Sequence, residues 1–124
     1  MRYALKESAI SFLQLAAAGH AEQAFSQYCA PGFCHHNPFF RSDGKSLMTA
    51  MQQNAIAHPD KIFEVQRALQ DGELVAVHSR IRFQDAAHMM AVVHLFRFHE
   101  GKIIELWDVG QAVPDQSPNE LGMF

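Results

Sequence analysis

The spacing of apolar residues divides the chain into a helical N-terminal part and a C-terminal part made of strands. Apolar side chains recur at helical spacing up to Gly19, again up to Pro31-Gly32, and a third time up to His58-Pro59-Asp60. The expected helices are residues 2–18, residues 20–30 and, from a cap at Ser42 or Asp43, a helix to about residue 57, with a short extended segment at 33–40.

From Lys61 onward the spacing changes from helical to alternating, which predicts β-strands. The expected strands are residues 62–69, 74–83, about 88–98 and a last one after the turn Glu100-Gly101. Three helices followed by a four-stranded antiparallel meander is an α+β pattern, best packed as a curved sheet around the helices. Such a cone leaves a cavity between its concave face and the long helix. We expect one domain, residues 1–124, with residues 114–124 forming a tail that docks through Met123-Phe124.

The last hairpin places two titratable side chains on an otherwise apolar face. Alternation puts Met90, Val92, His94, Phe96 and Phe98 on one side, with Ile104, Leu106 and Asp108 on the same side of the return strand. If the turn pairs residues whose numbers sum to 202, His94 lies opposite Asp108 and Arg97 lies opposite Glu105 on the other side. A one-residue change in turn type would offset these pairs. In apolar surroundings a carboxyl group can acquire the acid–base properties that catalysis near neutral pH needs. The alternative is a buried hydrogen bond between His94 and Asp108 that only fixes the sheet.

Composition excludes several classes of partner. The 124 residues are 48% hydrophobic and 19% charged with a net charge of −3, so there is no basic surface for nucleic acid. No apolar run approaches the roughly 20 residues of a membrane span, and charged residues stand where a signal peptide would be apolar. Cys29 and Cys34 have no second pair to complete a zinc set, and we expect reduced cysteines in a cytoplasmic protein.

The other histidines are expected at different places, some near the cavity and some at the surface. His36 lies at the expected mouth of the cavity, whereas its neighbour His35 should point the other way, to the surface. His78 faces outward by alternation, unless a bulge turns it inward. Because the spacings of His36, His78, His94 and Asp108 match no metal motif, no metal and no cofactor are expected. The remaining histidines, His20, His58, His88 and His99, are expected at the surface.

Three segments resemble a known family. The run from Gly101 to Val109 resembles the closing hairpin of SnoaL-like polyketide cyclase relatives, which belong to the nuclear transport factor 2-like superfamily. The segments 35–38, 43–45 and 111–124 are similar to the branch of that family predicted to catalyse aldol condensations. The resemblance spans nearly the whole chain. It implies a cone-shaped, cystatin-like α+β fold with three N-terminal helices packed in a curved antiparallel sheet around a deep apolar pocket.

The resemblance also implies roles for the hairpin residues. Asp108 matches the aspartate that removes a proton from carbon beside a carbonyl group, and His94 matches a residue on the partner strand. Family members of this branch usually carry an acidic residue near position 94 and a histidine near 106, whereas this chain has His94 and Leu106.

We therefore predict a small cofactor-free lyase or isomerase that acts on an apolar carbonyl substrate. Asp108 would abstract the proton, His94 would hold or share it, and His36 or His78 would hydrogen-bond the enolate oxygen. The residues expected to contact the substrate are Phe12, Met51, Val92, Phe96, Phe98 and Leu106.

Two other functions stay open at this point. Because the superfamily includes non-enzymes, the same pocket could belong to a binding protein for a hydrophobic small molecule. A hydratase-type reaction would need an Asp–Arg–Asp set inside the cone, and Arg97 faces outward. The other side of the sheet is too apolar to stay in water, which predicts a homodimer through Val93, Leu95, Ile103, Trp107 and Val109.

Overall fold

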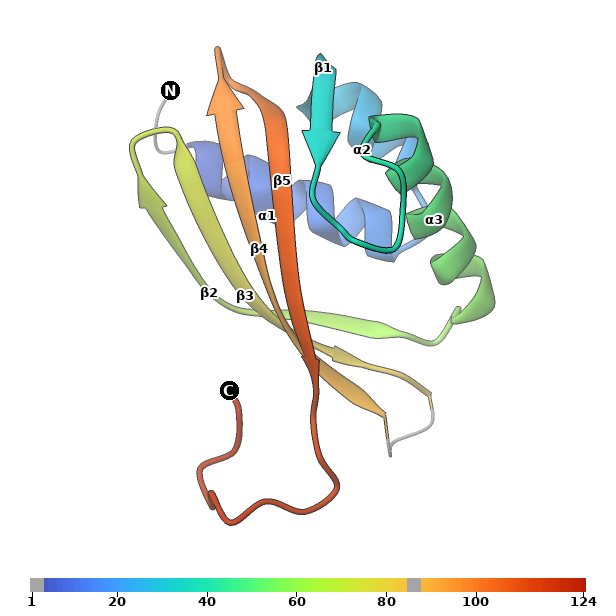
Figure 1. The fold of residues 1–124 in the computed structure, drawn as a ribbon, viewed down its shortest axis with the longest axis vertical. Helices are drawn as coiled ribbons and strands as arrows, with labels where there is room; N and C mark the ends of the chain where they lie inside the picture. Colours follow the sequence, from blue (N-terminus) through green and yellow to red (C-terminus); the bar gives the residue numbers. More distant parts are fainter. Residues whose placement is uncertain (1–3, 85–87) are drawn as a thin grey trace.

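The computed structural model describes residues 4–84 and 88–124 and has the predicted α+β architecture, with helices against one side of a strongly twisted sheet (Figure 1). The elements are α1 (Ala4–Ala17), α2 (Ala21–Tyr28), β1 (Cys29–His35), α3 (Gly44–Ala57), β2 (Ile62–Asp71), β3 (Leu74–Arg82), β4 (Met89–His99) and β5 (Lys102–Ala112). The first residues expected in helix 2–18 and the expected link 85–87 lie outside the described residues. Of the two predicted caps, Asp43 caps α3, since its carboxylate accepts a hydrogen bond from the Ser46 backbone N–H at 2.9 Å.

The sequence did not predict that β1 belongs to the sheet. The described sheet has five strands in the order β1-β5-β4-β3-β2, and β1 runs parallel to β5 while the other neighbours are antiparallel. The predicted helix to Ala30 is therefore too long, because Cys29 and Ala30 already belong to β1. Pro31 and Gly32 lie inside this edge strand, where proline is tolerated because one side has no ladder partner.

The register of the β4–β5 hairpin is confirmed near the predicted site. His94 pairs with Asp108 and Arg97 pairs with Glu105. Glu100 and Gly101 both have positive φ, 50° and 81°, as a two-residue turn of the primed type requires. The register then shifts between Arg97 and Phe98, so that Phe98 pairs with Ile103. This bulge turns Ile103 into the core, and its predicted place on the outer face is wrong.

At one end, packed side chains fill the space between the helices and the sheet. Leu5, Ala9, Phe12, Leu13 and Ala16 of α1 are buried, as helical spacing predicts, and they pack with Val75, Val77, Phe96, Phe98, Ile103 and Leu106 of the sheet. The rings of Phe12 and Phe96 meet edge to face with centroids 6.0 Å apart. Interlocked rings leave no room for a ligand here, so any cavity lies towards the other end.

The C-terminal tail returns to the outer face of the sheet, opposite the helices. The Phe124 ring stacks on His78, with centroids 5.9 Å apart, and the Arg80 guanidinium lies 5.2 Å from the ring centroid. The chain end thus contacts its own body on strand β3. None of the described helices is long and apolar enough to cross a membrane.

Candidate functional site

A cavity of about 580 Å³ lies between α1, α3 and the helix-facing side of the sheet. Its lining consists of Leu13, Ala16, Ala17, Asn37, Phe40, Leu47, Ala50, Met51, Gln53, Asn54, Lys61, Phe63, Ile81, Phe83, Met90, Val92, His94 and Asp108. The walls are mainly apolar with a few polar groups, which is the composition of a small-molecule site. A second hollow of about 660 Å³ lies between α2 and α3, but its polar side chains belong to helix surfaces and none is a buried titratable group.

Asp108 is half-buried and is oriented by Asn37. The Asn37 side-chain Nδ2 donates to Asp108 Oδ2 at 2.9 Å, while Asn37 Oδ1 accepts from the Phe39 backbone N–H at 2.9 Å. The second bond determines which end of the amide faces the aspartate. Among the described residues the other carboxylate oxygen, Oδ1, has no hydrogen-bond partner. One oxygen is thus held in place while the other is available to a ligand.

Asn37 is in turn held by the residue that sequence reasoning misplaced. His35 was expected at the surface, but it is only 2% exposed. Its Nδ1 accepts from the Asn37 backbone N–H at 3.1 Å, and its Nε2 donates to the Arg41 carbonyl. Because Phe33 is buried, two-residue alternation along β1 turns His35 inward as well. The prediction failed since β1 was not recognised as a strand of the sheet.

His94 lies in the cavity wall and is 6% exposed. Burial lowers its pKa from 6.5 to about 4, because the imidazolium would lose its hydration, and the carboxylate of Asp108 offsets this only in part. The imidazole is therefore neutral near pH 7. Within the described part of the chain, its Nδ1 is buried without a hydrogen-bond partner. Buried polar atoms are rarely left unpaired, so this nitrogen stands out among the polar groups of the cavity wall.

Lys61 is a second polar group of the cavity that sequence reasoning missed. Its Nζ donates to Asn54 Oδ1 at 2.6 Å, and burial lowers its pKa. The sequence offered only its place directly after the helix stop His58-Pro59-Asp60, and a lysine at a helix–strand junction carries no functional signal. Asn37 had a weak signal, an asparagine before proline in a loop at the expected mouth.

The predicted substrate contacts divide into two groups. Val92 and Met51 line the cavity. Phe12, Phe96, Phe98 and Leu106 are at most 1% exposed and belong to the solid end of the core instead. Alternation identifies which side of a strand faces the helices, but it does not tell how far along the strand the helix packs.

Two of the four predicted catalytic residues are on the wrong side of the sheet for that role. His36 is stacked on Trp107 and is hydrogen-bonded to Glu105, and His78 contacts Arg67 and Phe124, all on the outer face. The pairing of β3 with β4 is continuous through His78, so the bulge that would have turned it inward is not there. Neither ring can reach a molecule beside Asp108. The four residues weighed as a metal set are therefore not brought together.

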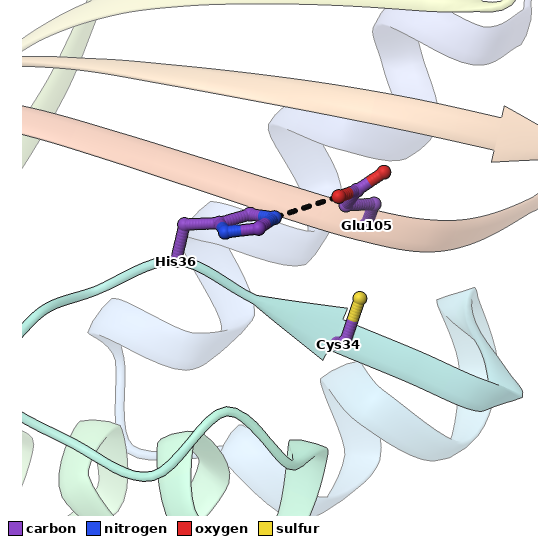
Figure 2. A group of neighbouring side chains, drawn as sticks. All are labelled: Cys34, His36 and Glu105. Atoms are coloured by element: carbon purple, nitrogen blue, oxygen red, sulfur yellow. Dashed lines mark hydrogen bonds and ion pairs between the residues drawn. The ribbon is translucent and has the colours of Figure 1, made fainter.

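A different set of metal-ligand side chains does meet on the outer face. Cys34, His36 and Glu105 place one ligand atom each within 4.8 Å of the others (Figure 2). This cluster lies across the sheet from the cavity and shares no residue with its lining.

Comparisons with known proteins agree on family and fold. The family model of the SnoaL-like domain matches residues 9–106. An NTF-2 like protein of unknown function from Burkholderia xenovorans LB400 has a TM-score of 0.77 at 19% identity, over 96% of this chain and 91% of its own. AclR from Streptomyces galilaeus, described as a "putative hydroxylase", has a TM-score of 0.74 at 17% identity, over 90% and 91%. A "putative polyketide cyclase" from Acidithiobacillus ferrooxidans has a TM-score of 0.72 at 17% identity, over 86% and 87%.

No curated protein sequence matches the chain. The structural neighbours confirm the predicted nuclear transport factor 2-like fold. At identities below 20% they establish the fold alone, and their differing descriptions leave the activity to be argued from the cavity.

Proposed function

We propose that this chain, which belongs to the SnoaL-like domain family, is a lyase or isomerase that removes a proton from carbon beside a carbonyl group. The reaction would be of the cyclase or aldol type, on a small apolar carbonyl compound. The observation that carries the proposal is the pairing of an oriented carboxylate with a buried neutral imidazole in one mainly apolar cavity.

Asp108 is the proposed base. Asn37 holds its Oδ2, so that Oδ1 can accept the proton without any rearrangement of the side chain. No metal or cofactor is invoked for this step, because the carbonyl group itself makes the neighbouring C–H acidic.

His94 is the proposed partner of the enolate oxygen. A neutral imidazole can donate an N–H to the oxygen on which negative charge develops, and its low pKa keeps it neutral at working pH. This assignment replaces His36 and His78, whose rings lie on the outer face. Lys61, which also lines the cavity, would bind a polar group of the substrate and so help to orient it.

The direct test measures proton exchange. The wild-type protein is incubated in D2O with cyclohexanone, acetophenone and 2-tetralone, and deuterium uptake at the α-carbon is followed by NMR. Asp108→Asn should lower the exchange rate at least about 100-fold, since the base is lost, while the melting temperature stays within about 5 °C. Asp71→Asn, at the end of β2, is the matched control and should exchange like wild type. Exchange that survives Asp108→Asn would refute the role of Asp108.

The same experiment separates the binding-protein alternative, which the mainly apolar lining favours. A binding protein would retain a hydrophobic molecule in equal amount to the chain through purification, and it would catalyse no exchange with any of the three ketones.

We also propose a homodimer that associates through the outer face of the sheet. Leu95 and Val109 are 40% and 67% exposed there, beside the half-buried Val93 and Trp107. Sedimentation that returns a monomer at micromolar concentration would contradict this. A cytoplasmic location is proposed on the two free thiols, Cys29 and Cys34, since a reducing compartment keeps thiols free.

A further inference from the structure

We propose that Cys34, His36 and Glu105 form a binding site for a divalent metal ion that accepts sulfur ligands, with Zn²⁺ as the best match. A thiolate, an imidazole and a carboxylate are the three ligand types that zinc takes in proteins. The sequence predicts no metal site, because Glu105 is remote in the chain and meets the other two only through the unpredicted pairing of β1 with β5.

The distances suit a tetrahedral ion. One ligand atom from each residue lies within 4.8 Å of the other two, and Figure 2 shows the Cys34 sulfur directed towards the His36–Glu105 pair. Zinc–ligand bonds of about 2.0–2.3 Å imply about 3.3–3.6 Å between neighbouring ligand atoms. Small side-chain rotations are enough to close the set around an ion.

The backbone already holds the three residues in position. Cys34 and Glu105 are direct partners in the parallel β1–β5 ladder. Cys34 and His36 are two residues apart, so both side chains point to the outer face, and the His36 backbone N–H bonds the Leu106 carbonyl at 3.0 Å. Binding therefore requires no change in the course of the chain.

The His36 ring is oriented by Trp107. The two rings are stacked with centroids 5.1 Å apart and an angle of 8° between their planes. This stacking directs Nε2 at Glu105 Oε2, 2.6 Å away. The stacked tryptophan thus restricts the rotation of the His36 ring before any ion binds.

The hydrogen bonds and charges of the cluster are compatible with a bound divalent ion. Arg97 donates to Glu105 Oε1 at 3.2 Å, on the oxygen that His36 does not use. Oε2 can thus exchange the His36 hydrogen bond for the metal while Arg97 keeps its own contact. A thiolate and a carboxylate together balance the two positive charges of the ion. Three protein ligands leave the fourth position to water, as in zinc sites that are open to solvent.

Metal titration of the intact protein tests the proposal. Calorimetry with ZnCl2 should give one ion per chain. CoCl2 should give the near-ultraviolet charge-transfer absorption of a cobalt–thiolate bond, together with the visible bands of a tetrahedral ion. Loss of one ligand in Cys34→Ser or His36→Gln should weaken binding at least about 10- to 100-fold, and Cys34→Ser should also remove the charge-transfer band.

Two controls are matched to the ligands. Cys29→Ser removes the other cysteine, whose thiol pKa burial raises to about 12, and it should bind as wild type. His99→Gln changes an exposed histidine that also lies near a glutamate, Glu100 at 3.7 Å, but belongs to no group of metal-ligand side chains within the described residues. It should bind as wild type too.

Wild-type protein without saturable zinc binding, or without the cobalt–thiolate band, would overturn the proposal even if no variant folds. Binding that is unchanged in Cys34→Ser would overturn it as well. The outcome is independent of the reaction proposed for the cavity, because the exchange assay there uses no metal and the two sites share no residue.

Discussion

An imidazole and a carboxylate lie close together on each face of strand β5, and the two pairs differ in exposure, hydrogen bonding and pKa. On the outer face His36 and Glu105 are 2.6 Å apart, the histidine side chain is 48% exposed, and hydrogen bonds from His36 and Arg97 lower the pKa of Glu105. On the inner face His94 and Asp108 are direct strand partners, but burial lowers the pKa of His94, and its buried Nδ1 has no hydrogen-bond partner in the part of the chain that the structure describes.

The difference shows what burial does to the same two groups. Outside, water and salt screen the charge of Glu105, and the pair is hydrogen-bonded without a ligand. Inside, the imidazole is neutral, and among residues 4–84 and 88–124 one of its nitrogens and one oxygen of the carboxylate have no hydrogen-bond partner. The inner pair is therefore the one for which we propose a carbonyl substrate, and the outer pair is proposed to have a further use only together with Cys34.

The largest effect is expected on the pH dependence of the free energy of unfolding. The pKa of His94 is about 4 in the folded protein and 6.5 in the unfolded chain, so between these values the unfolded chain binds more protons. Stability from this group is present above pH 6.5 and is lost as the pH falls towards 4, by roughly 3 kcal/mol, since one pKa unit corresponds to about 1.4 kcal/mol.

Urea unfolding of wild type and His94→Leu at pH 7, 5.5 and 4 measures this loss. The titration of the carboxylates other than Asp108, which interacts with His94, is common to both proteins and cancels in the comparison. The free energy of unfolding of wild type should fall more steeply by the stated amount. Equal slopes would mean that His94 is not held neutral by burial.

A slightly smaller effect is expected on catalysis. His94→Leu should lower the exchange rate about 100-fold, because the hydrogen bond to the enolate oxygen is lost, which equals about 2.7 kcal/mol in the transition state. His94→Gln keeps an N–H donor and should recover part of the rate. His78→Leu on the outer face should exchange like wild type, and a loss there would restore the role that the sequence suggested for His78.

A third prediction concerns the orientation of the base. Asn37→Ala removes the donor to Asp108 Oδ2 and should lower kcat about tenfold, since a hydrogen bond to a charged group contributes about 1.5 kcal/mol. KM should change little, because Asn37 positions the base and is not needed to bind the substrate. Equal changes in KM and kcat, with a fall in melting temperature, would show that Asn37 only supports the loop.

The sequence was enough to predict the inner pair but not its surroundings. The pairing of His94 with Asp108 was predicted correctly, but the turn alone does not produce it. The two-residue turn pairs His99 with Lys102 and Phe98 with Ile103, and the bulge at Ile104 then shifts the register by one residue. Alternation also gave the correct side for Phe96. It could not show that α1 closes that end of the cone, because helix placement depends on packing between segments remote in the chain.

The surroundings of the outer pair could not be predicted from the sequence, for a single reason. Pro31-Gly32 is a common helix stop and gives no sign of a strand, so β1 and its parallel partner went unrecognised. The inward side of His35, the outward side of His36 and the contact of Cys34 with Glu105 all depend on that one pairing. A single missed strand thus hid both Asn37 and the metal-ligand cluster.

The smallest effect is expected from the outer pair in metal-free buffer. Glu105→Gln removes the charge that His36 and Arg97 bind, but these contacts are exposed to solvent and screened, so the urea midpoint should stay within error of wild type. Raising the salt to about 1 M should leave the two proteins equal, since little electrostatic stabilisation exists to be screened. Asp108→Asn, measured beside it, should shift the midpoint more, because it alters a partly buried hydrogen bond. If Glu105→Gln were instead the more destabilising change, the outer pair would be a structural ion pair, and the contrast between a screened pair outside and an unsatisfied one inside would not hold.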